Sequence, residues 1–132
     1  MIHTLSTIAT PVGTPQPSVN FNGAWVNELG SRMDLLVARD GKITGIYKTA
    51  VGSPGNLEGF DLLGFASGDL ISFTVNFGKY GSLTSWCGQH TEDVAGSTII
   101  KTMWILAQNV PDPQEPNNLW GAVLTGSNNF TR

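Results

Sequence analysis

Hydrophobic and polar residues alternate along much of this chain, and the alternation predicts β-strands. The clearest case is LISFTVNF, residues 70–77, in which Ile71, Phe73, Val75 and Phe77 are separated by polar residues. Side chains alternate between the two faces of a strand, so one face of this segment is apolar and suited to burial. No segment has a sustained helical period. The pattern therefore predicts an all-β protein.

Turn signals divide the rest of the chain into strands of similar length. Asp40-Gly41 is a hairpin signature, and the stretches AVGSPGN and VPDPQEPNN interrupt the chain with Gly and Pro. About eight short strands with short connections predict an up-and-down barrel or a sandwich. Besides 70–77, the predicted strands cover residues 23–31, 33–40, 42–50, 57–66, 82–91, 98–108 and 119–131.

Several predicted strands carry polar residues on the same face as large apolar ones. In GAWVNELGS, residues 23–31, alternation puts Trp25, Asn27, Leu29 and Ser31 on one face. Buried polar groups cost free energy unless they find partners, and a packed sandwich core would not repeat them from strand to strand. A small barrel that holds one ligand accommodates them. The other mixed faces comprise Tyr47 and Thr49; Ser82, Thr84 and Trp86; Thr102, Trp104 and Leu106; and Trp120, Ala122, Leu124, Gly126, Asn128 and Phe130.

Composition supports this fold class and narrows the possible partners. The 132 residues are 40% hydrophobic and 13% charged, with 16 Gly and 7 Pro, a profile typical of turn-rich β proteins. The net charge of −3 gives no hint of a nucleic-acid partner. No apolar run approaches the roughly 20 residues that span a bilayer. We expect neither a nucleic-acid partner nor a membrane partner.

The sequence predicts one folded domain after an N-terminal tail. Residues 1–20, with Thr, Ser and three Pro, are expected to be flexible, and residues 21–132 to form the barrel. The start lacks the basic region and the continuous apolar stretch of a signal peptide. The compartment stays open: the chain is intracellular, or secreted if an export signal has been removed.

Residues that could carry metal or catalytic chemistry are sparse. Cys87 is the single cysteine, which excludes an intrachain disulfide, and its place after Trp86 predicts an outward thiol. His3 and His90 have no ligand-type spacing. No inward position carries a nucleophile beside a base, or a pair of carboxylates. We expect no metal, no cofactor and no enzymatic activity.

Five motifs resemble successive strands of the avidin–streptavidin family of biotin-binding proteins. They are GAWVNELGS, GKITGIYKTAVGS, TSWCGQH, IIKTMWIL and LWGAVLTGSNNFT, in the family's order from about Asn22 to Arg132. The resemblance implies an eight-stranded antiparallel up-and-down β-barrel. It also implies assembly as a tetramer or dimer, and non-catalytic binding of biotin at one open end. A tetramer is expected here because Trp120 matches a tryptophan that tetrameric members use.

The resemblance also implies which residues contact the urea group of biotin. Asn27, Ser31 and Tyr47 match the three groups that hydrogen-bond the ureido oxygen. Asn128 matches the acceptor for one ureido N–H, where the family uses Asn or Asp. Thr49 matches the hydroxyl that meets the other ureido nitrogen.

The remaining site residues follow from the same resemblance. Thr84 matches the residue that faces the thioether sulfur of biotin. Trp86, Trp104 and Phe77 match the aromatic walls, with Phe77 at a position where the best-known members carry Trp. The rest of the predicted site consists of Ser82 and Ser53 at the valerate carboxylate, together with Leu29, Val51 and Leu106, and of Trp120 contributed by a neighbouring subunit.

Other interpretations of the same residues stay open. The Trp residues are also typical of a plain core, and inward hydroxyls are also satisfied by buried water. Asn27 with Ser31 is also typical of a local turn at the end of a strand. At the level of function, the alternatives are a lipocalin-like carrier of another small ligand and an assembly-only barrel with a degenerate pocket.

Overall fold

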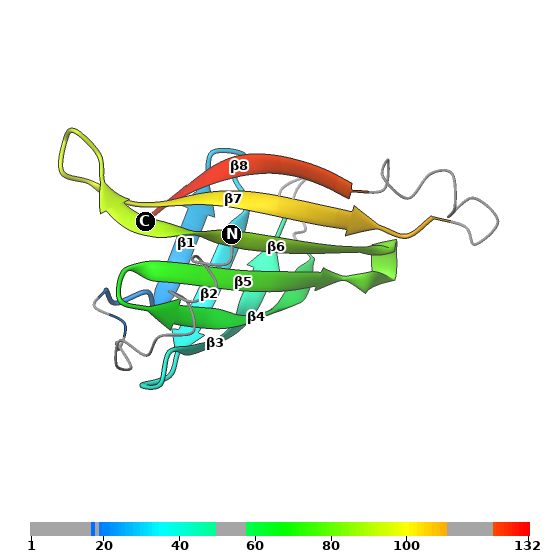
Figure 1. Ribbon diagram of the computed structural model, residues 1–132, viewed down its shortest axis with the longest axis horizontal. Helices are drawn as coiled ribbons and strands as arrows, with labels where there is room; N and C mark the ends of the chain where they lie inside the picture. Colours follow the sequence, from blue (N-terminus) through cyan, green and yellow to red (C-terminus); the bar gives the residue numbers. More distant parts are fainter. Residues whose placement is uncertain (1–16, 18, 50–57, 111–122) are drawn as a thin grey trace, which may run out of the picture.

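The computed structural model describes residues 17, 19–49, 58–110 and 123–132, which form a closed barrel (Figure 1). Each of eight strands pairs antiparallel with the next, and β8 returns to pair with β1. The predicted fold class is confirmed. The elements are β1 (Gly23–Asn27), β2 (Arg32–Val37), β3 (Lys42–Lys48), β4 (Gly59–Ser67), β5 (Leu70–Phe77), the 3-10 turn η1 (Gly78–Tyr80), β6 (Ser82–Glu92), β7 (Thr98–Gln108) and β8 (Val123–Thr131).

One end of the barrel, which we call the mouth, is defined by strand ends that the register brings together. Phe77 at the end of β5 pairs with Ser82 at the start of β6, and Ser82 pairs in turn with Gln108 at the end of β7. The end of β3 likewise pairs with the starts of β2 and β4. Side chains near these ends therefore line a common opening, although they come from distant parts of the sequence.

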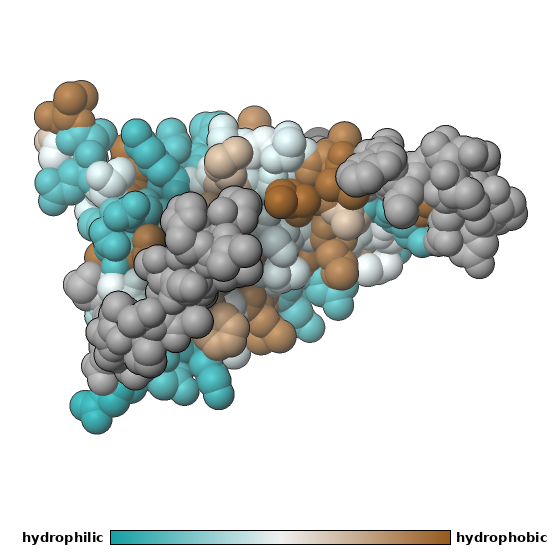
Figure 2. Space-filling model, viewed as in Figure 1, coloured by the Kyte–Doolittle hydropathy of each residue, from teal (hydrophilic) through white to brown (hydrophobic). Residues whose placement is uncertain are grey.

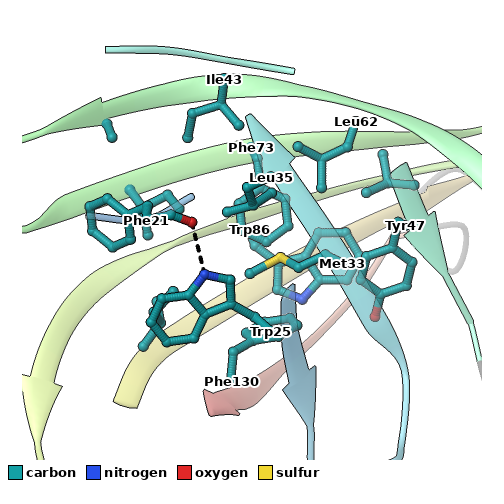
Figure 3. Close-up of a cluster of buried hydrophobic side chains, with 14 of the residues drawn as sticks. Phe21, Trp25, Met33, Leu35, Ile43, Tyr47, Leu62, Phe73, Trp86 and Phe130 are labelled. Carbon is teal, nitrogen blue, oxygen red and sulfur yellow. Dashed lines mark hydrogen bonds between the residues drawn. The ribbon is translucent and has the colours of Figure 1, made fainter. Parts of the chain in front are cut away.

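The predicted alternation builds the barrel interior. Trp25 is fully buried, and its indole Nε1 donates a hydrogen bond to the backbone carbonyl of Phe21 at 2.9 Å (Figure 3). The Arg132 guanidinium lies 4.2 Å from the centroid of the Trp25 ring, a cation–π contact. The buried hydrophobic residues are Phe21, Trp25, Met33, Leu35, Ile43, Tyr47, Phe60, Leu62, Ala66, Ile71, Phe73, Val75, Trp86, Ile100 and Phe130.

The hairpin predicted at Asp40-Gly41 is confirmed between β2 and β3. Gly41 has a φ of +92°, which a side chain would strain, and its N–H donates to the carbonyl of Ala38. The Asp40 carboxylate accepts a hydrogen bond from the N–H of Lys42 at 3.1 Å. Both residues of the signature thus contribute directly to the turn.

The first predicted strand is too long, and Leu29, one of its predicted inward residues, is not buried. Strand β1 ends at Asn27, whose side-chain Oδ1 accepts hydrogen bonds from the backbone N–H groups of Leu29 and Ser31, both at 3.0 Å. Gly30, with a φ of +85°, completes the turn. Leu29 is 64% exposed, whereas Ser31 is buried. The turn that the sequence left open as an alternative is present.

The other strands lie close to their predicted positions. Strands β5 and β7 have the predicted bounds, and β6 is one residue longer. Strand β2 begins one residue earlier and ends three residues earlier than predicted. Residues at the ends of three other predicted strands, namely 50, 57 and 119–122, lie outside the described residues.

Two residues of the predicted N-terminal tail contact the barrel. Pro17 forms an isolated parallel bridge with Gly68, and Val19 packs against the hydrophobic core. The rest of that tail, residues 1–16 and 18, lies outside the described residues. Across the described ranges, no helix is long and apolar enough to cross a membrane.

Candidate functional site

Three polar residues from different elements meet inside the barrel. Asn27 ends β1, Ser31 closes the following turn, and Tyr47 is the penultimate residue of β3. All three are buried. The Asn27 amide nitrogen Nδ2 donates to the Tyr47 hydroxyl at 3.3 Å, and Ser31 also hydrogen-bonds that hydroxyl. The structure thus brings together the three residues that were predicted to contact the ureido oxygen.

The local turn determines which atoms this cluster presents. Because Asn27 Oδ1 accepts two backbone N–H groups, the Nδ2 end of the amide is directed toward Tyr47. Burial raises the pKa of Tyr47 above its ordinary value, against the opposing effect of hydrogen bonds from Ser31 and Asn27. The phenol is therefore protonated at neutral pH. An amide N–H and two hydroxyls can donate together to one acceptor oxygen, an arrangement that favours a polarised carbonyl.

A second polar group is built on β6 and β8. The Trp86 indole Nε1 donates to Asn128 Oδ1 at 3.0 Å, and Asn128 Nδ2 donates to Glu28 Oε1 at 2.9 Å. Glu28 Oε2 also accepts the backbone N–H of Asn129 at 2.9 Å. Trp86 and Asn128 are both buried. The acceptor end of the Asn128 amide thus lies beside Trp86, and the donor end lies against a carboxylate.

Glu28 belongs to this group although strand alternation assigned it to the outer face. Burial acts to raise the pKa of Glu28, but hydrogen bonds from the Asn128 side chain and from the backbone N–H groups of Glu28 and Asn129 outweigh it. The pKa therefore lies below its ordinary value, and the carboxylate is charged at neutral pH. No sequence signal identified this residue, because its contact depends on the turn after β1 and on a partner 100 residues away.

Contacts between aromatic rings connect the two polar groups. The Trp86 ring stacks on Phe73, with centroids 5.2 Å apart, and lies 5.0 Å from the Tyr47 ring (Figure 3). Phe77 contacts Tyr47 edge to face at 5.9 Å. Trp104 pairs with Trp86 across β6 and β7 and is partly buried. The predicted aromatic residues thus come from adjacent strands.

A glycine makes room for the Trp104 indole. Gly126 lies opposite Trp104 on β8, and a Cβ atom there would lie 2.3 Å from Trp104 Cζ2. Any side chain at this position would force the indole to move. The lack of a side chain at Gly126 therefore leaves the space that the Trp104 indole occupies.

Four further predicted site residues are described. Thr84 is 3% exposed, and its Oγ1 has no hydrogen-bond partner within the described part of the chain. Leu106 lies opposite Thr84 in the register of β6 and β7. Ser82 and Thr49 are half-buried at strand ends near the mouth. Three others, Val51, Ser53 and Trp120, lie outside the described residues.

The mouth also carries a charged cluster that the sequence did not predict. Glu58 accepts hydrogen bonds from the Lys79 ammonium at 2.5 Å and from the Tyr80 hydroxyl at 2.6 Å. Of the three effects that lower the pKa of Glu58, the hydrogen bond from Lys79 is the largest, followed by the hydrogen bond from Tyr80 and the charge of Lys79. The Tyr80 ring contacts Phe60, which in turn contacts Phe77. The turn η1 is thus tied to the start of β4.

Metal-binding side chains do not gather in the described part of this region. Within the described ranges, no group of three or more His, Cys, Asp or Glu side chains could hold a metal ion. The Cys87 thiol is free and exposed, as predicted from its place after Trp86. The arrangement is one of hydrogen-bond donors, one buried acceptor and aromatic rings, which suits binding.

Comparison with known proteins identifies the family of this chain. A model of the Avidin family matches residues 15–132. The chain belongs to the avidin family. The family that the five sequence motifs predicted is therefore confirmed.

Relatives of this avidin-family chain match it along most of their length. Avidin-related protein 4/5 of Gallus gallus is 39% identical over 119 residues, which cover 86% of this chain and 77% of that protein. Avidin of Gallus gallus is 33% identical over 136 residues, covering 97% and 88% of the two chains.

Solved structures agree with the sequence comparison. Xenavidin superimposes with a TM-score of 0.75 at 31% identity, covering 87% of this chain and 98% of that one. The X-ray structure of a biotin binding protein from chicken gives a TM-score of 0.74 at 30% identity, covering 87% and 97%.

The unpartnered hydroxyl of Thr84 leads to a prediction about folding stability. An unpaired buried hydroxyl costs about 1–3 kcal/mol, and valine has nearly the same shape as threonine. Thr84→Val should therefore leave the Tm of the ligand-free protein unchanged or raise it. Thr102→Val is the matched control, because Thr102 Oγ1 donates to the Asn128 carbonyl at 2.9 Å. The control should lose about 0.5–1.5 kcal/mol. Equal losses in the two variants, measured by thermal denaturation, would contradict the prediction.

Proposed function

We propose that this avidin-family chain binds biotin inside the mouth of its barrel, one molecule per chain, without chemical conversion. The observation that carries the proposal is the pairing of converging donors with a buried acceptor. A urea has one carbonyl oxygen between two N–H groups. Asn27, Ser31 and Tyr47 can donate to that oxygen, and Asn128 Oδ1 can accept from one N–H. The likeness to the chicken biotin binding protein supports the same ligand.

The other predicted residues are assigned to the rest of the ligand. Thr84 offers its hydroxyl to the thioether sulfur, and Thr49 meets the second ureido N–H. The apolar faces of the bicyclic ring pack against the aromatic residues, where rings contribute contact area and defined geometry. Ser82 at the mouth binds the valerate carboxylate. The proposed biotin site consists of Asn27, Leu29, Ser31, Tyr47, Thr49, Val51, Ser53, Phe77, Ser82, Thr84, Trp86, Trp104, Leu106 and Asn128, with Trp120 from a neighbouring subunit.

High affinity is part of the proposal, and preorganisation supports it. The Asn27 amide is oriented by its own turn, and the Asn128 amide is held between Trp86 and Glu28. Groups that are already oriented before the ligand arrives lose less entropy on binding. A protein that binds biotin tightly and performs no reaction on it acts by sequestering or scavenging the vitamin.

Biotin binding should be stoichiometric and should stabilise the fold. Isothermal titration calorimetry is expected to give one biotin per chain. Differential scanning calorimetry should show a higher Tm with excess biotin, because a ligand that binds only the folded state shifts unfolding by mass action. The absence of both a heat of binding and a thermal shift at excess biotin would refute the proposed function.

Substitutions should separate contacts with the urea from contacts with the carboxylate. Asn27→Ala and Tyr47→Phe should weaken the binding of free biotin and of amide-linked biotin equally, because both ligands keep the urea. Ser82→Ala should weaken the binding of free biotin more than that of amide-linked biotin. A hydrogen bond to a charged group contributes about 1.5–3 kcal/mol, against roughly 0.5–1.5 kcal/mol for a hydrogen bond to a neutral group. Dissociation constants from competition assays test this. Equal losses for both ligands in Ser82→Ala would show that the carboxylate binds elsewhere.

We further propose a homotetramer in which Trp120 covers the biotin of a neighbouring subunit. Tetramers are typical of the avidin family. Exposed apolar side chains support a contact surface on the outer face of β6–β8, where Figure 2 has brown residues gathered. Trp120 lies outside the described residues, just before β8, and tryptophan is enriched at interface hot spots. The exposed apolar residues of this face are Leu83, Met103, Ile105 and Val123.

The assembly can be tested together with the role of Trp120. Native mass spectrometry at micromolar concentration with biotin bound should give a tetramer. Trp120→Lys should lower the affinity for biotin and weaken the tetramer together, because one side chain contacts both the neighbouring subunit and its biotin. A monomer or dimer would contradict the tetramer. Weakened assembly with unchanged biotin affinity would mean that Trp120 does not reach the neighbour's ligand.

A further inference from the structure

The Asn128 amide is held between one donor and one acceptor. On its oxygen side the Trp86 indole N–H donates to Oδ1 at 3.0 Å, and on its nitrogen side Nδ2 donates to Glu28 Oε1 at 2.9 Å. Rotating the amide by half a turn would place Oδ1 against the carboxylate and Nδ2 against the indole N–H. Both contacts would then be repulsive, so the two partners together select one orientation.

Glu28 is itself held in place. Its second oxygen, Oε2, accepts the backbone N–H of Asn129 at 2.9 Å, so the carboxylate binds the side chain of one β8 residue and the backbone of the next. Hydrogen bonds to an ionised group are shorter and about twice as strong as neutral ones. The low pKa of Glu28 is consistent with a charged carboxylate in this position.

The negative charge also affects the far end of the amide. A hydrogen bond from Nδ2 to a carboxylate polarises the amide, and linked hydrogen bonds strengthen one another. Glu28 itself is exposed, whereas the Asn128 amide that it polarises is buried. Asn128 Oδ1 becomes a better acceptor as a result. A neutral asparagine thereby gains part of the acceptor strength that an aspartate would have, without placing a full charge among the aromatic rings.

We propose that Glu28 is a positioning residue that makes the pocket specific for a ligand with an N–H donor at Asn128. It orients the Asn128 amide so that Oδ1 faces the ligand, and its charge strengthens that oxygen as an acceptor. The inference rests on the proposed function, because the ligand N–H is taken to be that of the biotin urea. In this role Glu28 acts on the ligand through Asn128 and does not contact the ligand.

The first test uses the ligand-free protein and is independent of biotin. In ¹⁵N-labelled protein, Glu28→Ala should speed hydrogen exchange of the Trp86 indole N–H, because the Asn128 oxygen that accepts this proton is no longer held. Glu92→Gln is the control, since Glu92 is an exposed carboxylate at the far end of β6. In Glu92→Gln the hydrogen-exchange rate of the Trp86 indole N–H should be unchanged. Unaltered exchange in Glu28→Ala would overturn the inference, whatever the protein binds.

The second test asks whether Glu28 acts through Asn128. Glu28→Ala should weaken biotin about tenfold, the loss expected for one charge-assisted hydrogen bond. In an Asn128→Ala background the same substitution should change the dissociation constant less than about twofold. A tenfold loss in both backgrounds would assign Glu28 a general structural role and overturn the inference. Failure of the unaltered protein to bind biotin would instead refute the proposed function, and the ligand assignment with it.

A rescue experiment covers the case in which Asn128→Ala does not fold. Asn128→Asp would place two carboxylates in contact and should weaken biotin, because neither can donate to the other. Adding Glu28→Gln to that variant supplies an amide that donates to Asp and should restore affinity to within a few-fold of the unaltered protein. Rescue supports the pair as a unit. An equally weak double variant would overturn the inference.

Discussion

Two backbone N–H groups donate to the side-chain oxygen of Asn27, and much of the mouth depends on this contact. It ends β1 after five residues and reverses the chain toward β2, so that Ser31 is buried. It also directs the other end of the Asn27 amide toward Tyr47. Finally, it places Glu28 in the turn, where its carboxylate reaches β8. One local turn therefore positions groups on two sides of the proposed ligand.

The polar residues of the interior differ in how fully they are satisfied. Asn27, Tyr47, Thr102 and Asn128 have hydrogen-bond partners, whereas Thr84 Oγ1 has none among the described residues. An unpaired buried polar group lowers folding stability. Such a cost is expected where the missing partner is a ligand, because function and stability then make opposite demands on one side chain.

Closure of the barrel between β1 and β8 brings the turn after β1 next to Asn128. β8 pairs with β7 along nine residues and with β1 along only two, so the seam between first and last strands has a short backbone ladder. Glu28 adds side-chain hydrogen bonds across this seam to Asn128 and Asn129. The same contacts that orient the Asn128 amide therefore also join the two ends of the sheet. Substitution of Glu28 affects both the orientation of the amide and the stability of the seam. A measurement on the Trp86 indole N–H is therefore needed to tell the two effects apart.

Strand alternation, a property of local sequence, determined most of the fold. Phe73, Val75, Thr84, Trp86 and Asn128 all face inward, because a two-residue period is fixed by backbone geometry and needs no knowledge of neighbours. Turn residues such as Asp40-Gly41 gave hairpin positions for the same reason. The aromatic and polar character of the pocket was therefore predictable from the sequence.

Tertiary structure decided the residues around the first turn. Alternation extended through residues 28–31 placed Leu29 inside and Glu28 outside, but the Asn27 turn interrupts the period, so Leu29 is exposed and Glu28 reaches Asn128. That last contact joins residues 100 positions apart and forms only when β8 closes onto β1. The sequence by itself determined which faces are buried within a strand. Only the closed barrel decided which side chains meet between its two ends, because that depends on register across the seam and not on local periodicity.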